Sequence, residues 1–166
     1  MPEKETLERA REDKEEGKAP STQAGEFVRE EIHHIREGKH GARSTQQAIA
    51  IGLSKARRAG VDLPPPEAGA APEKTRRSAK RAQEAGQGRR KPASRPRAGK
   101  AVKSALKREG RQAASPKALS KQASAAAARR TKADRSATAK QGARTKGPAK
   151  RSAAAKKAAR TRAAKS

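Results

Sequence analysis

The stretch STQAGEFVREEIHHIREGKHGARSTQQAIAIGLSKARRAG, residues 21–60, contains two copies of one short pattern. Each copy begins with Ser-Thr-Gln, at residues 21–23 and again at residues 44–46, and each follows a Glu-Gly-Lys triplet. A glycine in the left-handed conformation commonly ends a helix, and a Ser or Thr hydroxyl commonly caps the next one. The pattern therefore predicts three helices, at residues 3–16, 22–37 and 45–59.

Apolar side chains recur at helical spacing in the second and third of these helices. The second helix has Ala24, Val28, Ile32 and Ile35 on one stripe with Phe27 at its edge, and the third has Ile49, Gly52, Leu53 and Ala56. Two such stripes joined by a short loop predict an antiparallel helical hairpin. We expect Gly52 to allow a close approach of the two helices.

Further signals mark the ends of these helices. Ser44 and Gln47, three residues apart, fit a capping box, and Gly60 followed by Val61 fits a helix end with an apolar contact. The first helix has only Leu7 and Ala10 to turn inward, so its packing on the other two is the least strongly predicted. The expected module is therefore a helical hairpin, or a three-helix module if the first helix also packs on it. About ten large apolar residues form a thin core, near the lower limit for independent folding, which favours a partner such as a second copy of the chain.

Charge divides the chain at Pro64-Pro65-Pro66. Residues 1–66 have 12 basic and 12 acidic side chains, whereas residues 67–166 have 31 basic and 5 acidic ones, so the second segment holds the whole net charge of +26. Its 30 alanines bury too little surface to offset the entropy of ordering the chain. The expected fold class is therefore all-α, with a small neutral helical module (1–66) and a long, largely disordered basic tail (67–166).

Transient helices are expected in this tail at residues 73–85, 101–109 and 116–131. Val102 and Leu106 share a face of the helix expected at 101–109, and Leu119 and Ala123 share a face of the helix expected at 116–131. These two tail helices could therefore form another, very small hairpin. The C-terminal end is almost wholly Ala, Lys, Arg, Ser and Thr. Such a run is disordered when free and can become helical when phosphates neutralise its charge.

Two tail segments resemble DNA-binding motifs. Residues 88–100 alternate Arg and Lys with Pro, an arrangement that can lie along a narrow minor groove. They resemble a degenerate AT-hook that lacks the central Arg-Gly-Arg-Pro. Ser115-Pro116-Lys117 resembles the Ser-Pro-Lys turns of linker-histone tails; it also fits a helix start, with Ser115 as cap and Pro116 at the first position, which we favour.

The composition excludes several classes of function. The chain has no Cys, and therefore no disulfide scaffold, no Cys-based zinc site and no thiol chemistry. No apolar run approaches the ~18 residues that span a bilayer, and the charged start does not fit a signal peptide, so we expect no membrane. Without a Gly-rich phosphate loop or a core large enough to fix a catalytic set, we expect no enzyme, no cofactor and no small-molecule substrate.

His33, His34 and His40 are the three histidines of the chain. Glu30 with His33, and Glu31 with His34, have the Glu-x-x-His spacing that places two metal ligands on one helix face. A carboxylate-bridged metal site would need further ligands from facing helices, and the third helix offers none. His33 projects opposite the apolar stripe, so a solvated face is the better interpretation, and we expect no metal site.

Ile51 lies away from the stripe of the third helix, beside Lys55 and Arg58. A singly exposed apolar residue, or one that the first helix covers, is the ordinary interpretation. The alternative is a partner-binding face formed by Ile51, Lys55 and Arg58. A helix-turn-helix is disfavoured because the loop is long for that motif and the helices are expected to be antiparallel.

Residues 21–31 and 43–60 resemble an uncharacterised family of small basic bacterial proteins. That resemblance implies a bacterial source and no assigned activity, and it supplies no site residues. Residues 154–160, Ala-Ala-Lys-Lys-Ala-Ala-Arg, are similar to the arms of histone H1-like bacterial nucleoid proteins, a compositional similarity that extends over about 60% of the chain. It implies a cytoplasmic, nucleoid-associated protein.

The function expected from the sequence is sequence-independent binding of nucleic acid, double-stranded DNA above all, through the basic tail. The N-terminal helices would serve association with a second copy or another partner. One alternative is an RNA- or ribosome-associated protein, which the scarcity of aromatics disfavours; another is a protein-binding adaptor with a polycationic tail. The residues expected to contact phosphates are Arg76, Arg77, Lys80, Arg81, Arg89, Arg90, Lys91, Arg95, Arg97, Lys117, Arg129, Arg130, Lys150, Arg151, Lys156, Lys157, Arg160 and Arg162.

Overall fold

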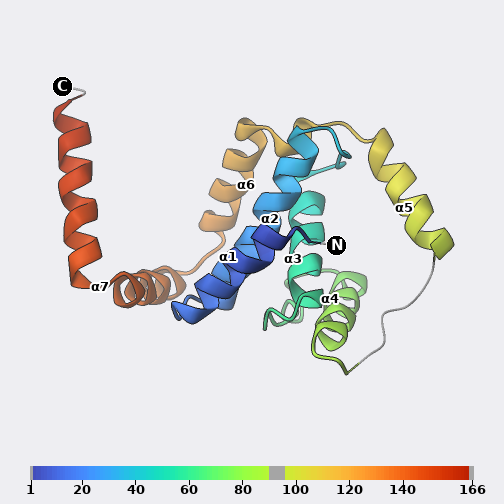
Figure 1. Cartoon of the computed structure of the whole chain (residues 1–166), viewed down its shortest axis with the longest axis horizontal. Coiled ribbons are helices and arrows are strands. Elements are labelled where there is room, and N and C mark those ends of the chain that lie inside the picture. The colour runs from blue at the N-terminus through green and yellow to red at the C-terminus, as the bar shows by residue number, and fades with distance from the viewer. Residues whose placement is uncertain (1, 90–95, 165–166) are drawn as a thin grey trace. The chain divides into compact units, whose positions relative to one another are not determined.

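The computed structural model describes residues 2–89 and 96–164, with residues 96–100 described by their backbone alone. Within these ranges the chain is all-helical and has no strand, and none of its helices combines the length and apolar character needed to cross a membrane. Two compact units are formed, residues 1–124 and residues 125–166 (Figure 1). The elements are α1 (Lys4–Glu15), α2 (Pro20–Arg36), α3 (Thr45–Arg58), α4 (Glu73–Gly86), α5 (Pro96–Arg108), the 3₁₀ helix η1 (Gln112–Ala114), α6 (Pro116–Ala128) and α7 (Lys132–Ala163).

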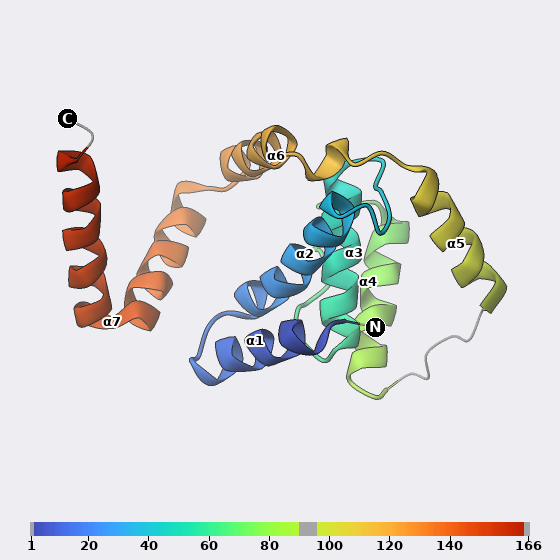
Figure 2. The ribbon, with the colours of Figure 1, turned by 45° about the horizontal axis from the view of Figure 1, so that its top comes forward.

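α2 and α3 form the antiparallel hairpin that the two stripes predict, with α1 against α2 and α4 against α3 (Figure 2). The two central helices are in direct backbone contact at Gly52. A Cβ atom there would lie 2.7 Å from the Cα of Val28 and 3.0 Å from the carbonyl oxygen of Phe27. The expected close approach at Gly52 is therefore confirmed.

Glycines end the first three helices as predicted. Gly17, Gly38 and Gly60 have φ values of +69°, +79° and +91°, in the left-handed region that glycine adopts without a steric penalty. The next N–H in each case donates back into the last helical turn: Lys18 to the carbonyl of Asp13, Lys39 to that of His34, and Val61 to that of Ala56. The apolar contact expected at Val61 is confirmed, because Val61 packs with Ala56 in a buried cluster.

The two Ser-Thr-Gln triplets differ in their structural role. Ser44 Oγ accepts a hydrogen bond from the Gln47 N–H at 3.1 Å, so the predicted cap of α3 is confirmed. The return bond goes to the N–H of Arg43 instead of Ser44, at 2.8 Å. At the first triplet the prediction is wrong: α2 begins earlier, at Pro20, with no side-chain cap, since proline has no N–H to satisfy.

The stripe predicted on α2 is largely buried, but the one on α3 is displaced. The most buried line of α3 consists of the small residues Ala48, Gly52 and Ala56, whereas Ile49 and Leu53 are only half buried. Small side chains bring the two backbones together, and the larger ones then flank the contact. α1 buries Ala10 as expected, but Leu7 is 38% exposed, and the helix buries Thr6 and Asp13 instead.

Segments beyond Pro66 complete the core of the first unit. Ala113 and Ala114 of η1 are buried in one cluster with Ile32 and Ile35, and Leu119 packs against the same cluster. The Thr45 hydroxyl donates to the carbonyl of Ala113 at 2.8 Å, and the Arg36 guanidinium donates to that of Ala114 at 2.9 Å. The expected separate hairpin of the second and third tail helices is therefore wrong: Leu119 packs on the front helices, and Val102 is exposed.

Backbone-to-backbone contacts explain why an alanine-rich segment is ordered here. A Cβ atom on Gly86, at the end of α4, would lie 1.8 Å from the Arg57 carbonyl oxygen, and one on Gly41 would lie 1.9 Å from that of Glu109. The N–H of Gly41 also donates to the Leu106 carbonyl at 2.8 Å. Such close contacts bury backbone and alanine surface efficiently. The size of the side chains alone therefore underestimates how much surface this segment buries.

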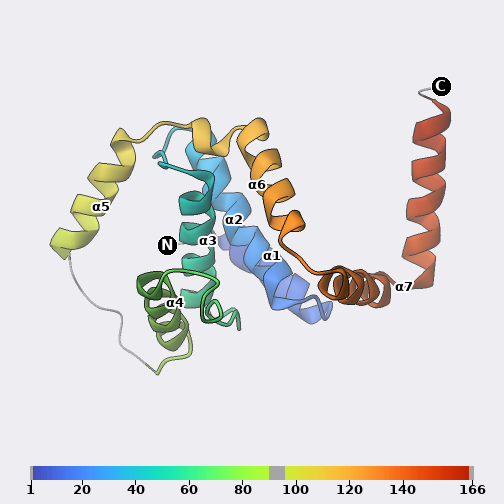
Figure 3. The ribbon, with the colours of Figure 1, turned by 180° about the vertical axis from the view of Figure 1, so that it is seen from behind.

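The expected disorder of the tail is not what the structure shows, since its described residues are largely helical. α4, α5 and α6 correspond to the helices expected at 73–85, 101–109 and 116–131. The Ser115 hydroxyl accepts from the Ala118 N–H at 3.3 Å, which confirms the favoured interpretation of Ser115-Pro116-Lys117 as a helix start (Figure 3 shows α6 from behind). α7 lies where disorder was expected.

We expect Gly52→Ala to lower the free energy of unfolding by about 1–3 kcal/mol, because the new methyl group must push the backbones of α2 and α3 apart. Gly25→Ala is the matched control: Gly25 lies in α2, is exposed and has open space around its Cα. There the change should stabilise by up to about 1 kcal/mol through helix propensity. Urea unfolding of both variants measures the difference, and equal effects would contradict the close approach.

Candidate nucleic-acid interface

α7 is the most cationic element of the chain. It contains 11 basic side chains and one acidic one in 32 residues, and it has no large apolar side chain. All of these basic side chains are exposed. The helix therefore has nothing with which to form a core of its own, and its charge faces solvent.

The cations of α7 surround the helix instead of forming one stripe. At 100° per residue, Lys150 and Lys157 share one face, Arg151 and Arg162 share a second, and Lys156 and Arg160 share a third. An arrangement of this kind leaves no neutral side that could pack on another element. It presents positive charge to an anionic surface whatever the rotation of the helix about its axis.

A glycine–proline pair divides α7 into two straight segments. Gly147 has φ +66° and ψ 169°, outside the helical region, and Pro148 follows it. Proline is favoured at the first position of a helix and glycine just after the end of one, so the pair ends the first segment and begins the second. Each segment is about 22 Å long at 1.5 Å per residue.

The single acidic residue of α7 is engaged in its N-terminal cap. The Thr131 hydroxyl accepts from the Asp134 N–H at 3.1 Å, and the Asp134 carboxylate accepts from the Thr131 N–H at 3.1 Å. These bonds hold the pKa of Asp134 below its usual range. The carboxylate therefore stabilises the helix start and lies far along the sequence from the cations of the second segment.

The other residues expected to contact phosphates are distributed over several elements. Arg76 and Arg77 of α4 both pair with Glu73, at 2.7 and 3.6 Å, so part of their charge is compensated within the helix. Arg90, Lys91 and Arg95 lie outside the described residues, and only the backbone of Arg97 is described. The remaining ones outside α7 are exposed: Lys80, Arg81, Arg89, Lys117, Arg129 and Arg130.

The three residues of the expected partner-binding face do not present a uniform surface. Ile51 is half buried and Arg58 is exposed. The side chain of Lys55 is only 22% exposed because its ammonium group lies between two buried carboxylates. Lys55 and Arg58 line a hollow of about 440 Å³ together with Leu7. Leu7 was expected to turn inward but is exposed.

Those two carboxylates belong to Glu30 and Glu31 of α2. Lys55 Nζ lies 2.9 Å from Glu30 Oε1 and 2.7 Å from Glu31 Oε2. Glu30 also accepts a hydrogen bond from the backbone N–H of Glu3 at 3.0 Å, which fastens the start of α1 to α2. This buried ion triad therefore joins α1, α2 and α3.

Glu30 and Lys55 each favour the charged form of the other. Burial alone would raise the pKa of Glu30, but the hydrogen bonds from Lys55 and from the Glu3 N–H outweigh it, and the pKa lies below its usual range. Burial would likewise lower the pKa of Lys55, but the facing carboxylates of Glu31 and Glu30 raise it above its usual range. Lys55 is thus a charged structural residue.

Two of the three histidines lie against the same carboxylates. His33 is exposed and pairs with Glu37 at 2.9 Å, as expected for a solvated face. His34 and His40 are largely buried instead, with side chains that are 13% and 18% exposed. The Glu-x-x-His spacing of Glu31 and His34 was the available signal for that pair. His40 was considered with the other histidines, but its position beside Glu31 was not predicted, because it lies in the loop and not on a facing helix.

Residues 17–67 match a family described as a family of unknown function (DUF6496). The match covers α2, α3 and the loop between them, and therefore the hairpin and the buried charges, and it is less than half of the chain. No curated protein and no solved structure matches the chain. The comparisons thus support an uncharacterised helical domain in the front half of the first unit.

We expect Lys55→Met to lower the free energy of unfolding by about 3–5 kcal/mol, because it leaves two buried carboxylates without their shared cation. Lys39→Met is the matched control: Lys39 also faces two carboxylates, those of Glu37 and Glu3, but is half exposed. Its loss should cost less than about 1 kcal/mol. Chemical denaturation at neutral pH compares them, and a small effect at Lys55 would contradict the structural role of the triad.

Proposed function

We propose that this protein binds nucleic acid, double-stranded DNA above all, through sequence-independent contacts between its C-terminal cations and phosphates. The observation that carries the proposal is the surface of α7, with 11 exposed basic side chains, one acidic side chain and no large apolar one that could pack on another element. Cations spread round a helix suit a partner with charge everywhere on its surface. They do not suit a pocket or a single protein face.

The contrast between the two units supports this proposal. In the first unit several half-buried cations are paired with carboxylates, as Lys55 is with Glu30 and Glu31 and Lys18 is with Asp13. Residues 125–166 contain 14 basic residues and a single acidic one, so most of their charge is not balanced by acidic residues of the same segment. A polyanion supplies that balance, and the counterions that it releases drive the association.

The choice of DNA over RNA rests on the aromatic content. Proteins that read single-stranded RNA stack bases on Phe, Tyr, Trp or His. This chain has one Phe and no Tyr or Trp, and Phe27 is fully buried. Contacts to phosphates alone need no such platform. The compositional resemblance of the tail to histone H1-like proteins supports a place in a bacterial nucleoid.

The kink at Gly147 fits this mode of binding. The two segments of α7 can each follow a different stretch of the phosphate backbone, and each is longer than the roughly 12 Å width of a major groove. The first unit would then serve association with a second copy or another protein. RNA binding and a protein adaptor with a cationic tail remain the competing functions.

A charge-neutralising variant of the full chain tests the proposal, with glutamine replacing the six basic residues Lys150, Arg151, Lys156, Lys157, Arg160 and Arg162. In fluorescence anisotropy with a duplex of arbitrary sequence, affinity should fall. The slope of log affinity against log salt should become shallower by up to about 5. The reason is that each lost phosphate contact no longer releases its counterion.

The matched control exchanges Lys and Arg at the same six positions, which keeps the charge and changes the hydrogen-bonding groups. Sequence-independent binding predicts unchanged affinity and slope for it. An unaltered slope in the glutamine variant would contradict phosphate binding by α7. Tighter binding to single-stranded RNA of equal length would favour the RNA function, and no binding to either polymer at 50 mM salt would favour the adaptor.

A further inference from the structure

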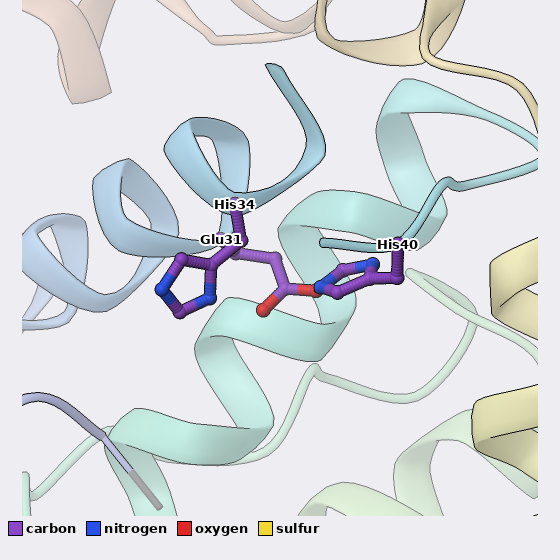
Figure 4. Close-up of side chains that lie close together, drawn as sticks. All are labelled: Glu31, His34 and His40. Atoms are coloured by element: carbon purple, nitrogen blue, oxygen red, sulfur yellow. The ribbon is translucent and has the colours of Figure 1, made fainter. Parts of the chain in front are cut away.

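Glu31, His34 and His40 bring three metal-binding groups together in the first unit. One ligand atom of each lies within 4.8 Å of the others. Glu31 and His34 project from one turn of α2, and His40 extends toward them from the loop before α3 (Figure 4). This cluster is separate from the cations assigned to nucleic-acid binding and does not depend on that function.

The outer contacts of the two histidines fix which ring nitrogens carry hydrogen. His34 Nε2 lies 2.8 Å from a carboxylate oxygen of Glu3, and His40 Nδ1 lies 3.1 Å from the Gly41 carbonyl oxygen. Both oxygens can only accept, so both of these nitrogens donate. In a neutral imidazole the other nitrogen then has a lone pair and no hydrogen.

Those two lone pairs are directed at the buried carboxylates of α2. His40 Nε2 lies 3.2 Å from Glu31 Oε1. His34 Nδ1 faces Glu31 in Figure 4 and also lies 4.0 Å from Glu30 Oε1. Acceptors that face one another at this distance repel unless a cation lies between them. A carboxylate or carbonyl behind each imidazole is also the usual outer partner of a metal-binding histidine.

The negative charge buried around Glu31 also favours the binding of a further cation. Glu31 is fully buried, and although Lys55 and His40 are close, neither carboxylate oxygen receives an aligned hydrogen bond. Two buried carboxylates, those of Glu30 and Glu31, share the single ammonium of Lys55. If Glu31 turned to another cation, Lys55 would keep Glu30, which is already its hydrogen-bonded partner at 2.9 Å.

We propose that Glu31, His34 and His40 bind a divalent transition-metal ion, with Zn²⁺ as the ion that their chemistry fits best. Two imidazole nitrogens and one carboxylate oxygen are a donor set that zinc takes in proteins, with the fourth position left to water. Zn²⁺ bonds of about 2.0–2.2 Å require donors closer together than 4.8 Å. A small movement of the loop that holds His40 brings them together.

Binding of this kind would tie the α2–α3 loop to α2. The same loop makes backbone contacts with residues 106–110, through Gly41 and Ala42. An ion that holds His40 would therefore also stabilise the docking of the tail on the hairpin, since a ligand that binds the folded state alone stabilises it.

Titration of the metal-free full chain with Zn²⁺ by isothermal calorimetry tests the proposal, in the absence of nucleic acid. We expect one ion per chain and a rise in melting temperature. His34→Ala and His40→Ala should each lose at least about a hundredfold in affinity, and Glu3→Gln, which alters an outer partner, about 10–100-fold. His33→Ala is the matched control, as His33 lies in the same helix and points to solvent, and it should bind as the unaltered chain does.

Circular dichroism of each metal-free variant separates loss of the site from loss of the fold. His40→Gln is the second variant for this purpose, because a loop residue is replaced by one of similar size. Failure of the unaltered chain to bind one Zn²⁺, or equal binding by the folded His34 and His40 variants, would overturn the proposal. So would nuclear magnetic resonance spectra in which both rings carry two protons and do not respond to Zn²⁺, because a proton would then occupy the place assigned to the metal.

Discussion

The first unit depends on the close approach of α2 and α3 at Gly52. With Gly52 against the backbone of Val28 and Phe27, the two helices are near enough for Lys55 to reach Glu30 and Glu31. The same approach brings the connecting loop, and His40 with it, over the end of α2. It also forms the surface on which Ala113, Ala114 and Leu119 pack. A larger residue at this one position would therefore disturb the hairpin, the buried charges and the docking of the tail together.

Local signals in the sequence predicted much of this fold. The glycines at 17, 38 and 60 and the cap at Ser44 placed the ends of the first three helices within a few residues, because these signals act over a single helical turn. The apolar spacing predicted the hairpin for the same reason. The docking of residues 106–119 was not predictable in this way. It depends on backbone contacts at Gly41 and Gly86, between segments far apart in the sequence, and alanine gives no periodic signal of its own.

The candidate sites show the same division. Composition alone identified the cationic segment, since charge density needs no knowledge of contacts. It did not show that Lys55 belongs to a buried triad, nor that His34 and His40 face Glu31, because these depend on which side chains the hairpin brings together. Eight residues of loop separate Arg36 from Thr45, and the position of His40 within them could be known only from the folded chain.

The structure thus assigns opposite roles to the charges of the two units. In the first unit, charged residues such as Glu30, Glu31 and Lys55 are buried, paired and hold helices together, whereas the cations of α7 are exposed and far outnumber its one acidic residue. The boundary between these roles does not coincide with Pro64-Pro65-Pro66, where the net charge changes, because residues as far as Leu119 pack on the front helices. A folded first unit that incorporates part of the basic segment, and a cationic unit that follows it, is the central claim of this account.

Hydrogen exchange of the full chain, measured by mass spectrometry with and without duplex DNA, tests that claim most directly. In the free chain, residues 106–119 should be protected together with α2 and α3, while α7, which has no large apolar side chain to pack, should exchange rapidly. Addition of DNA should slow exchange in α7 and leave the first unit unchanged. Exchange of residues 106–119 as rapid as that of α7, or protection by DNA confined to the first unit, would contradict the account.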